Sequence, residues 1–306
     1  MIDELTVPGT PELVVADFGG RPDGPAVVLL HGFGGNCLHW AGFHWAGFAP
    51  LLTDRCRVFA MDLRGHGRSG DGAWRWDALV GDVRRVVEHL GLPRPVVVGH
   101  SLGGFVATMW AEQHPECRAL VNLDGLRPVE TGLPNYVGGD PEVIRRQRAE
   151  LSAVFAAREK AEAGAVDDDR YASLREQYRQ LGGDAAVAEL ARNVVEHDGS
   201  RYVRPAAEIV RAFRVQLREL DIFPVLAAVK SPALVCTATR PMPGAERFAD
   251  LLDAHRRGVD RDLAAARQAN PGLRVKHVPA SHNMIYERPR AIAALIRDFL
   301  GETGAE

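Results

Sequence analysis

Short, almost wholly apolar runs recur in the first and last parts of the chain, at residues 26–30, 56–61, 95–98, 119–123, 233–238 and 273–278. Helical segments are predicted among them at 76–90, 102–114 and 290–300, the last with Gly301 as its C-cap. Apolar strands that alternate with helices are typical of a parallel sheet covered by helices on both faces. The pattern therefore predicts an α/β fold with a mostly parallel, doubly wound sheet.

This alternation stops between residues 127 and 230. One helix is predicted from 142 to 164, after Asp140-Pro141, and a second over 168–181, ending at Gly182-Gly183. A third follows Asp184, and a fourth follows Pro205. The third has apolar residues at helical spacing, namely Val187, Leu190, Ala191, Val194 and Val195.

Four helices without a convincing strand predict a helical cap or lid at 127–230, inserted into a core of residues 1–126 and 231–306. The run Asp167-Asp168-Asp169 has two interpretations. It could be a cation site, but three acids in the first turn of a helix are better explained by the helix dipole.

Composition narrows the function classes. Of 306 residues, 46% are hydrophobic and 25% charged, as in a soluble globular protein, and the net charge of -3 gives no excess for nucleic acid or an anionic membrane. The four cysteines are far apart, which favours a reducing compartment over disulfides or zinc. The N-terminus has acids where a signal peptide needs a basic start. We expect a cytoplasmic protein that binds neither nucleic acid nor membrane.

The sequence Gly99-His100-Ser101-Leu102-Gly103 lies directly between a predicted strand and a predicted helix. This is the G-x-S-x-G context, in which a sharp strand-to-helix turn exposes a serine hydroxyl as nucleophile. Leu102 then begins the helix, where its unpaired N–H can stabilise an oxyanion.

A second glycine-rich turn, His31-Gly32-Phe33-Gly34-Gly35, follows the strand at 26–30 and can supply another backbone donor, for which Phe33 is the candidate. We expect His31 to be structural. The segment 62–69 (DLRGHGRS) lacks the G-K-[ST] ending of a phosphate loop, so an ion-paired turn explains it better.

These motifs, in this order, resemble the α/β-hydrolase superfamily over residues 26–126 and 231–300. The resemblance implies an eight-stranded sheet with a lid inserted after the sixth strand. Carried over by position, it implies Ser101 as nucleophile, Phe33 and Leu102 as oxyanion donors, and His282 as base. His282 also has the right place in the chain, because its loop follows the final strand and the order in this fold is serine, acid, histidine.

The position of the acidic residue of the expected triad departs from the usual pattern of this family, which places an aspartate after the seventh strand. The turn after the strand at 233–238 has no carboxylate up to residue 245, and Glu246 and Asp250 lie beyond it in a predicted helix. Asp124 ends the strand at 119–123 and is the better candidate. Haloalkane dehalogenases and zearalenone-type lactonases of this fold take their acid from that strand. The alternative for Asp124 is a turn-capping aspartate.

The combined expectation is a serine hydrolase of a carboxylic ester or lactone, acting through Ser101, Asp124 and His282 without metal or cofactor. A small hydrophobic substrate would bind near Gly32 and Phe33. A serine nucleophile argues against the aspartate-dependent dehalogenase and epoxide hydrolase reactions of this fold. Two alternatives stay open: a C–C bond hydrolase or lyase on the same triad, and a ligand receptor with vestigial hydrolysis.

One feature has no assigned role. The sequence HWAGF occurs at 39–43 and again at 44–48. An aromatic wall beside the site is one interpretation, and a tolerated loop duplication is the other.

Overall fold

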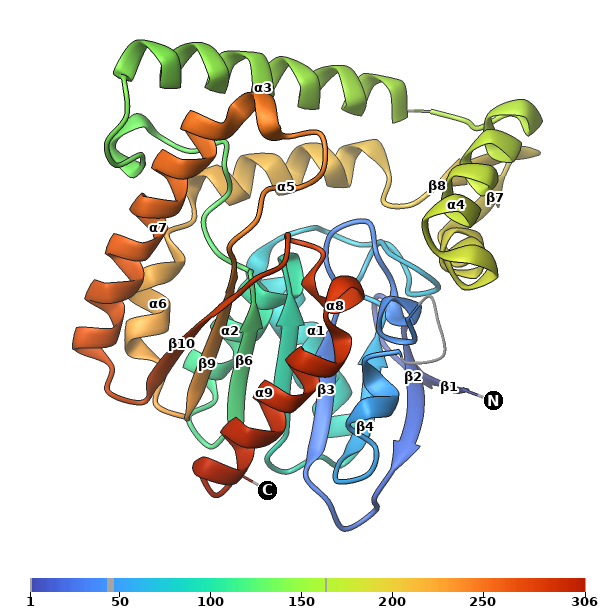
Figure 1. The fold of residues 1–306 in the computed structure, drawn as a ribbon. Helices are drawn as coiled ribbons and strands as arrows, with labels where there is room; N and C mark the ends of the chain where they lie inside the picture. Colours follow the sequence, from blue (N-terminus) through green and yellow to red (C-terminus); the bar gives the residue numbers. More distant parts are fainter. Residues whose placement is uncertain (1, 43–46, 163, 306) are drawn as a thin grey trace.

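An eight-stranded sheet forms the centre of the molecule, in the strand order β1-β2-β4-β3-β5-β6-β9-β10 (Figure 1). The computed structural model describes residues 2–42, 47–162 and 164–305. The sheet strands are β1 (Asp3–Val7), β2 (Leu13–Gly20), β3 (Ala26–Leu30), β4 (Arg57–Met61), β5 (Val96–His100), β6 (Ala119–Leu123), β9 (Ala233–Ala238) and β10 (Leu273–Val278). Among the described strands of this sheet, the antiparallel pairs are β1 with β2 and β2 with β4. The mostly parallel α/β sheet predicted from the apolar runs is therefore confirmed.

Alternate residues of the central strands enter two separate cores. In β3, Val28 and Leu30 face one core, whereas Val27 and Leu29 face the other. The first core is covered by α1 (Trp76–His89), α2 (Leu102–Gln113), α6 (Ile222–Ala228) and α7 (Ala249–Ala269). The second is covered by the 3-10 turns η1 (Cys37–Trp40) and η2 (Ala49–Leu51), with α8 (Met284–Glu287) and α9 (Pro289–Glu302). Because both faces are buried, the strands read as continuous apolar runs.

The segment between β6 and β9 contains α3 (Pro141–Glu162), α4 (Asp168–Arg192), the hairpin β7 (Val194–His197) and β8 (Ser200–Val203), α5 (Ala207–Glu219) and α6. Short 3-10 turns, η3 (Leu133–Asn135) and η4 (Glu246–Phe248), flank α3 and α7. We call residues 127–230 the insert. In Figure 1, α3, α4 and α5 lie beyond the end of the sheet at which β10 leads to α8, while α6 lies beside α7.

Two expectations for helices and strands were wrong. The insert was expected to have no strand, but the chain leaves α4 at Arg192 and forms the hairpin at Asp198-Gly199, both with positive φ (49° and 71°). Gly301 was expected to end the last helix, but α9 continues to Glu302 with Thr303 as C-cap. The predicted break at Gly182-Gly183 is present, because both residues have non-helical backbone angles within α4.

The first HWAGF copy begins in η1, where Trp40 is fully buried in the second core. Residues 43–46, with most of the second copy, lie outside the described residues, so the repeat keeps both interpretations. Over the described ranges, none of the helices combines the length and the apolar character needed to span a bilayer.

Candidate active site

Ser101 lies in a strained turn between β5 and α2. Its backbone angles are φ 51° and ψ −116°, a left-handed region that residues with a side chain rarely adopt. The turn is possible because its neighbours are glycines: a Cβ on Gly99 would lie 2.0 Å from the Gly103 carbonyl oxygen, and one on Gly103 would lie 2.0 Å from the Leu30 carbonyl oxygen. The strand, the helix and these close approaches together hold the serine at the carboxyl end of β5.

Asp124 follows the adjacent strand, β6, and is also left-handed, with φ 57°. Its carboxylate has two partners: Oδ1 accepts from the Ala238 N–H at 3.0 Å, and Oδ2 accepts from His282 Nδ1 at 2.7 Å. Burial alone would raise the pKa of Asp124, but the hydrogen bond and charge of His282 outweigh it and the pKa is lowered. The group is therefore ionised at neutral pH and faces an imidazole.

His282 lies in the loop after β10, with its side chain 40% exposed. Burial by itself lowers the pKa of His282, whereas the hydrogen bond and charge of Asp124 raise it above the ordinary value. Because Asp124 accepts from Nδ1, the neutral ring carries its proton there and leaves Nε2 as the free base nitrogen.

Ser101 and His282 share this edge of the sheet, and the neighbour of Ser101 holds the histidine loop. The His100 Nε2–H donates to the His282 carbonyl at 2.8 Å, and the two rings are 4.9 Å apart. Among the described residues, no hydrogen bond joins the Ser101 hydroxyl to His282. Such bonds are often long before substrate binds.

The turn at 32–35 lies against this serine. Gly35 N–H donates to the Gly32 carbonyl at 3.0 Å, and a Cβ on Gly32 would lie 3.3 Å from the Cβ of Ser101. A side chain at position 32 would therefore push against Ser101. Within the described part of the chain, neither the Phe33 N–H nor the Leu102 N–H donates to a backbone acceptor outside a helix or strand.

Contacts with the insert hold this turn in ways that sequence reasoning missed. Asn193, at the C-cap of α4, donates from Nδ2 to the Gly34 carbonyl and accepts from the Gly67 N–H, both at 2.8 Å. Asn36 Nδ2 donates to the Glu189 carbonyl at 2.8 Å. These partners are up to 159 residues apart in sequence, so no local pattern reveals them.

The other candidate residues lie elsewhere or have structural partners. Glu246 accepts from the Gly244 N–H in its own turn, and Asp250 accepts from Gln147 of α3 at 3.2 Å, so neither contacts His282. His31 accepts from the Leu63 N–H at 3.0 Å and its Nδ1 lies 2.7 Å from the Gly32 carbonyl, as a structural residue does. No group of three or more metal-binding side chains occurs among the residues described.

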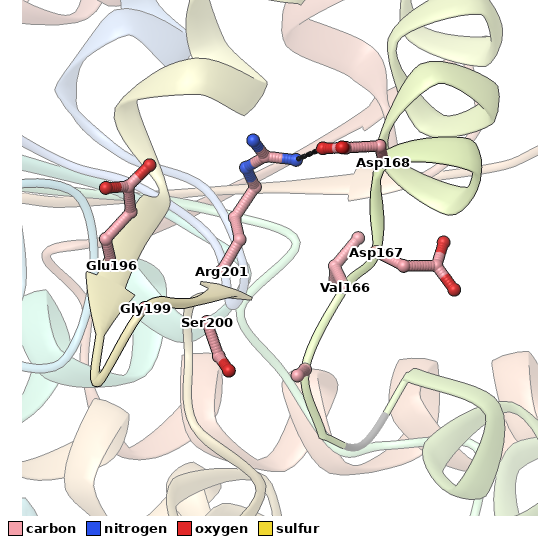
Figure 2. A pocket seen from close by; sticks show the side chains of 8 residues that line it. Val166, Asp167, Asp168, Glu196, Gly199, Ser200 and Arg201 are labelled. Carbon is pink, nitrogen blue, oxygen red and sulfur yellow. Dashed lines mark hydrogen bonds and ion pairs between the residues drawn. The ribbon is translucent and has the colours of Figure 1, made fainter.

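A separate hollow of about 540 Å³ lies within the insert, between the start of α4 and the hairpin (Figure 2). Its lining includes Asp167, Asp168, Glu196 and Arg201, and Arg201 donates to Asp168 at 3.0 Å. Asp167 is the N-cap of α4 and accepts from the Arg170 N–H, which supports the helix-start interpretation of the acidic run. None of Ser101, Asp124 and His282 lines this hollow.

Comparison with known proteins shows the family to which the chain belongs. A model of the alpha/beta hydrolase fold matches residues 25–178, half of the chain. The chain belongs to the α/β-hydrolase family. Among curated proteins it is similar to the pimeloyl-[acyl-carrier protein] methyl ester esterase of Methylococcus capsulatus, with 39% identity over 125 residues. That alignment covers 40% of this chain and 45% of the esterase, so it spans less than half the length of this α/β-hydrolase relative.

Solved α/β-hydrolase structures show the same fold over almost the whole chain. E-2-(acetamidomethylene)succinate hydrolase superposes with a TM-score of 0.69 at 22% identity, covering 98% of this chain and 100% of that one. The enol-lactonase from Burkholderia xenovorans superposes with a TM-score of 0.63 at 21% identity, with the same coverage. At such low sequence identities, the structural similarity establishes the fold but does not identify a substrate for this chain.

Proposed function

We propose that this α/β-hydrolase cleaves a carboxylic ester or lactone, with Ser101 as nucleophile, His282 as base and Asp124 as the acid that orients it. The observation that carries the proposal is the 2.7 Å hydrogen bond from His282 Nδ1 to Asp124, beside a serine in the strained elbow. A neutral imidazole fixed in this tautomer presents Nε2 to accept the serine proton.

The proposed reaction has two halves. Ser101 Oγ attacks the carbonyl carbon while its proton passes to His282 Nε2, and the N–H groups of Phe33 and Leu102 stabilise the oxyanion. The C–O bond of the ester then breaks, and His282 returns the proton to the departing alkoxide. Water attacks the acyl-enzyme with the same base, releasing the acid and the free serine; for a lactone, the alcohol and the acid are one molecule.

The insert is proposed to act as the cap of this site, with the core formed by residues 1–126 and 231–306. Phe213 of α5 stacks on Phe33 with ring centroids 4.3 Å apart and planes 9° apart. This contact supports an apolar substrate site bounded by Gly32, Phe33 and the insert, since ligand sites are mostly apolar with a few directed polar groups. A small hydrophobic ester or lactone is the proposed substrate class.

Turnover of a graded panel tests the proposal. Wild type and Ser101→Ala are assayed on p-nitrophenyl esters of increasing length, on lactones, and on aldehydes and diketones. Ester or lactone hydrolysis that disappears in Ser101→Ala is expected. Activity confined to the aldehydes or diketones would instead indicate a lyase or C–C bond hydrolase, and binding without turnover would indicate a receptor.

A further inference from the structure

Behind the proposed site, four polar side chains from distant parts of the chain form one continuous set of contacts. They are His100 at the end of β5, His39 in η1, Tyr286 in α8 and Glu189 in α4. His39, His100 and Glu189 are 8%, 3% and 7% exposed. Buried polar groups are costly unless each has a partner, so the protons of this set can be assigned one link at a time.

The first link fixes the tautomer of His100. Its Nε2 lies 2.8 Å from the His282 carbonyl, which can only accept, so Nε2 carries the proton. Burial, with His282 and His39 nearby, lowers the pKa of His100 well below its ordinary value. The ring is therefore neutral at physiological pH, and its Nδ1 is an acceptor.

The second link follows from the first. His39 Nε2 lies 3.1 Å from His100 Nδ1, and because His100 can only accept there, His39 must donate. The rings are 5.1 Å apart and inclined by 25°. His39 is the first residue of the HWAGF sequence, and its remaining nitrogen, Nδ1, contacts α8 and the insert.

The third link joins His39 to Tyr286 and Glu189. His39 Nδ1 contacts the Tyr286 hydroxyl and lies 3.4 Å from Glu189 Oε1, and the Tyr286 hydroxyl lies 3.1 Å from Glu189 Oε2. Burial and the nearby Glu189 raise the pKa of Tyr286 well above its ordinary value, so its hydroxyl keeps its proton.

At least two proton arrangements satisfy these contacts. Either a protonated His39 donates to Tyr286, which donates to a Glu189 carboxylate, or a protonated Glu189 donates to Tyr286, which donates to a neutral His39. Both contain the same number of protons and no net charge. In both arrangements the Tyr286 hydroxyl is hydrogen-bonded to Glu189, so removal of the Glu189 carboxylate removes this link between the insert and His39.

We infer that Glu189, a residue of the insert, is a positioning residue for His282, acting through Tyr286, His39 and His100 on the His282 backbone carbonyl. The inference rests on the proposed function, in which His282 is the base. Asp124 holds the imidazole from one side and His100 holds the backbone of the same residue from another. Displacement of a catalytic group by about 1 Å can cost ~10²-fold in rate. Weakening of the His100 hydrogen bond to the His282 carbonyl should therefore slow the chemical step.

The test compares Glu189→Leu, which removes both carboxylate oxygens at similar volume, with Glu189→Gln, whose amide donates to Tyr286 as a protonated Glu189 does. Glu176→Leu, on an exposed part of the same helix, is the control. We expect Glu189→Leu to lower kcat by ~10–100-fold with KM nearly unchanged. Its acid limb in kcat/KM should move to lower pH, because a loosened His282 loses part of its Asp124 contact. Glu189→Gln should recover most of kcat.

The inference would be overturned if Glu189→Leu folds and has the same kcat and the same acid limb of kcat/KM as Glu176→Leu. A change in KM alone would also overturn it. If Glu189→Leu does not fold, His39→Phe and His39→Gln decide. Phenylalanine keeps the ring volume but removes the donor to His100, whereas the Gln amide can restore it. The inference predicts a loss of kcat in His39→Phe that His39→Gln partly repairs, and equal rates in both variants would contradict it.

A spectroscopic readout separates this inference from the proposed function. The His282 Nδ1–H bonded to Asp124 should give a low-field proton resonance in wild type, whether or not any ester is turned over. The inference predicts that this resonance weakens or shifts in Glu189→Leu and is kept in Glu176→Leu. Absence of ester turnover in wild type would sink the function alone, while an unchanged resonance in Glu189→Leu would sink the positioning role alone.

Discussion

Single side chains decide the proposed chemistry of this site, and Asp124, the proposed acid, is the one whose position departs most from the usual family pattern. Its two carboxylate oxygens have different partners, the Ala238 N–H and His282 Nδ1. In Asp124→Asn one oxygen can still accept from Ala238, but the amide nitrogen would face His282 and favour the wrong tautomer. We expect kcat to fall by ~10³–10⁴-fold with little change in melting temperature.

Glu246→Gln and Asp250→Asn are the controls for this change. Both carboxylates are engaged away from His282, with the Gly244 N–H and with Gln147. We expect each substitution to cost less than about tenfold, as surface changes do. If Asp124→Asn keeps nearly wild-type activity while Glu246→Gln or Asp250→Asn is inactive, the acid is one of the residues that follow β9.

The pH profile reports the same pair. In the proposed mechanism His282 acts as a base only when neutral, and Asp124 raises its pKa above the ordinary value of about 6.5. The acid limb of kcat/KM should therefore lie above about 6.5, because activity is lost as pH falls through the raised pKa. In the residual activity of Asp124→Asn the limb should move to lower pH. A wild-type limb at or below 6.5 would contradict the assignment.

At this scale, the sequence could predict residues that belong to local patterns and little else. Ser101 is marked by its glycines, and Asp124 and His282 by their places after strands. The residues that support this site belong to no local sequence pattern. Tyr286 and His39 are 247 residues apart, and Asn193 and Gly34 are 159 residues apart. Such contacts arise only when the fold brings distant segments together.

Among the elements, six of the eight strands of the sheet, from β3 to β6 with β9 and β10, were predicted to within about two residues, because burial on both faces leaves uninterrupted apolar runs. The first two strands, β1 and β2, were not predicted. The hairpin β7–β8 was missed because Val194 and Val195 continue the apolar stripe of α4. The signal was nevertheless present, since Asp198-Gly199 is a typical two-residue hairpin turn. The polar cap at Asn193 ends the helix before the stripe does.

The C-terminal turn of α4 contacts the turn at 32–35, which contains the proposed oxyanion donor Phe33. Asn193→Asp keeps the size and the acceptor for Gly67 but sets a carboxylate oxygen against the Gly34 carbonyl. The repulsion should displace the turn at 32–35 and lower kcat by about 10–100-fold, with a smaller effect on KM. Asn135→Asp, in η3, makes the same charge change where the partner is the Thr131 hydroxyl. Equal kinetics in the two variants would show that Asn193 does not support the loop.

Across the whole molecule, the insert and the core are joined by a buried ion pair. Arg192 of α4 donates to Asp62 at 2.9 Å and to Glu4 of β1 at 2.6 Å, and Asp62 is fully buried. Arg192→Met leaves that carboxylate without its cation, which should cost about 3–5 kcal/mol of unfolding free energy. Calorimetry should show one transition at lower temperature, because insert and core unfold together.

The exposed pair of Arg179 and Glu176 provides the control for stability. Arg179→Met should change the free energy of unfolding by less than about 1 kcal/mol. Two separate transitions in wild type would mean that the insert folds independently. Equal stability of the two methionine variants would mean that the buried pair does not join insert and core.

Covalent capture of the nucleophile tests the central claim most directly. A fluorophosphonate probe reacts with a serine that a neighbouring base activates, and peptide mass analysis locates the adduct. We predict a single adduct, on the peptide that contains Ser101, which is absent in Ser101→Ala and forms much more slowly in Asp124→Asn and His282→Gln. An adduct on another residue, or labelling of Ser101 at the wild-type rate without His282, would contradict the assignment of Ser101 and its base.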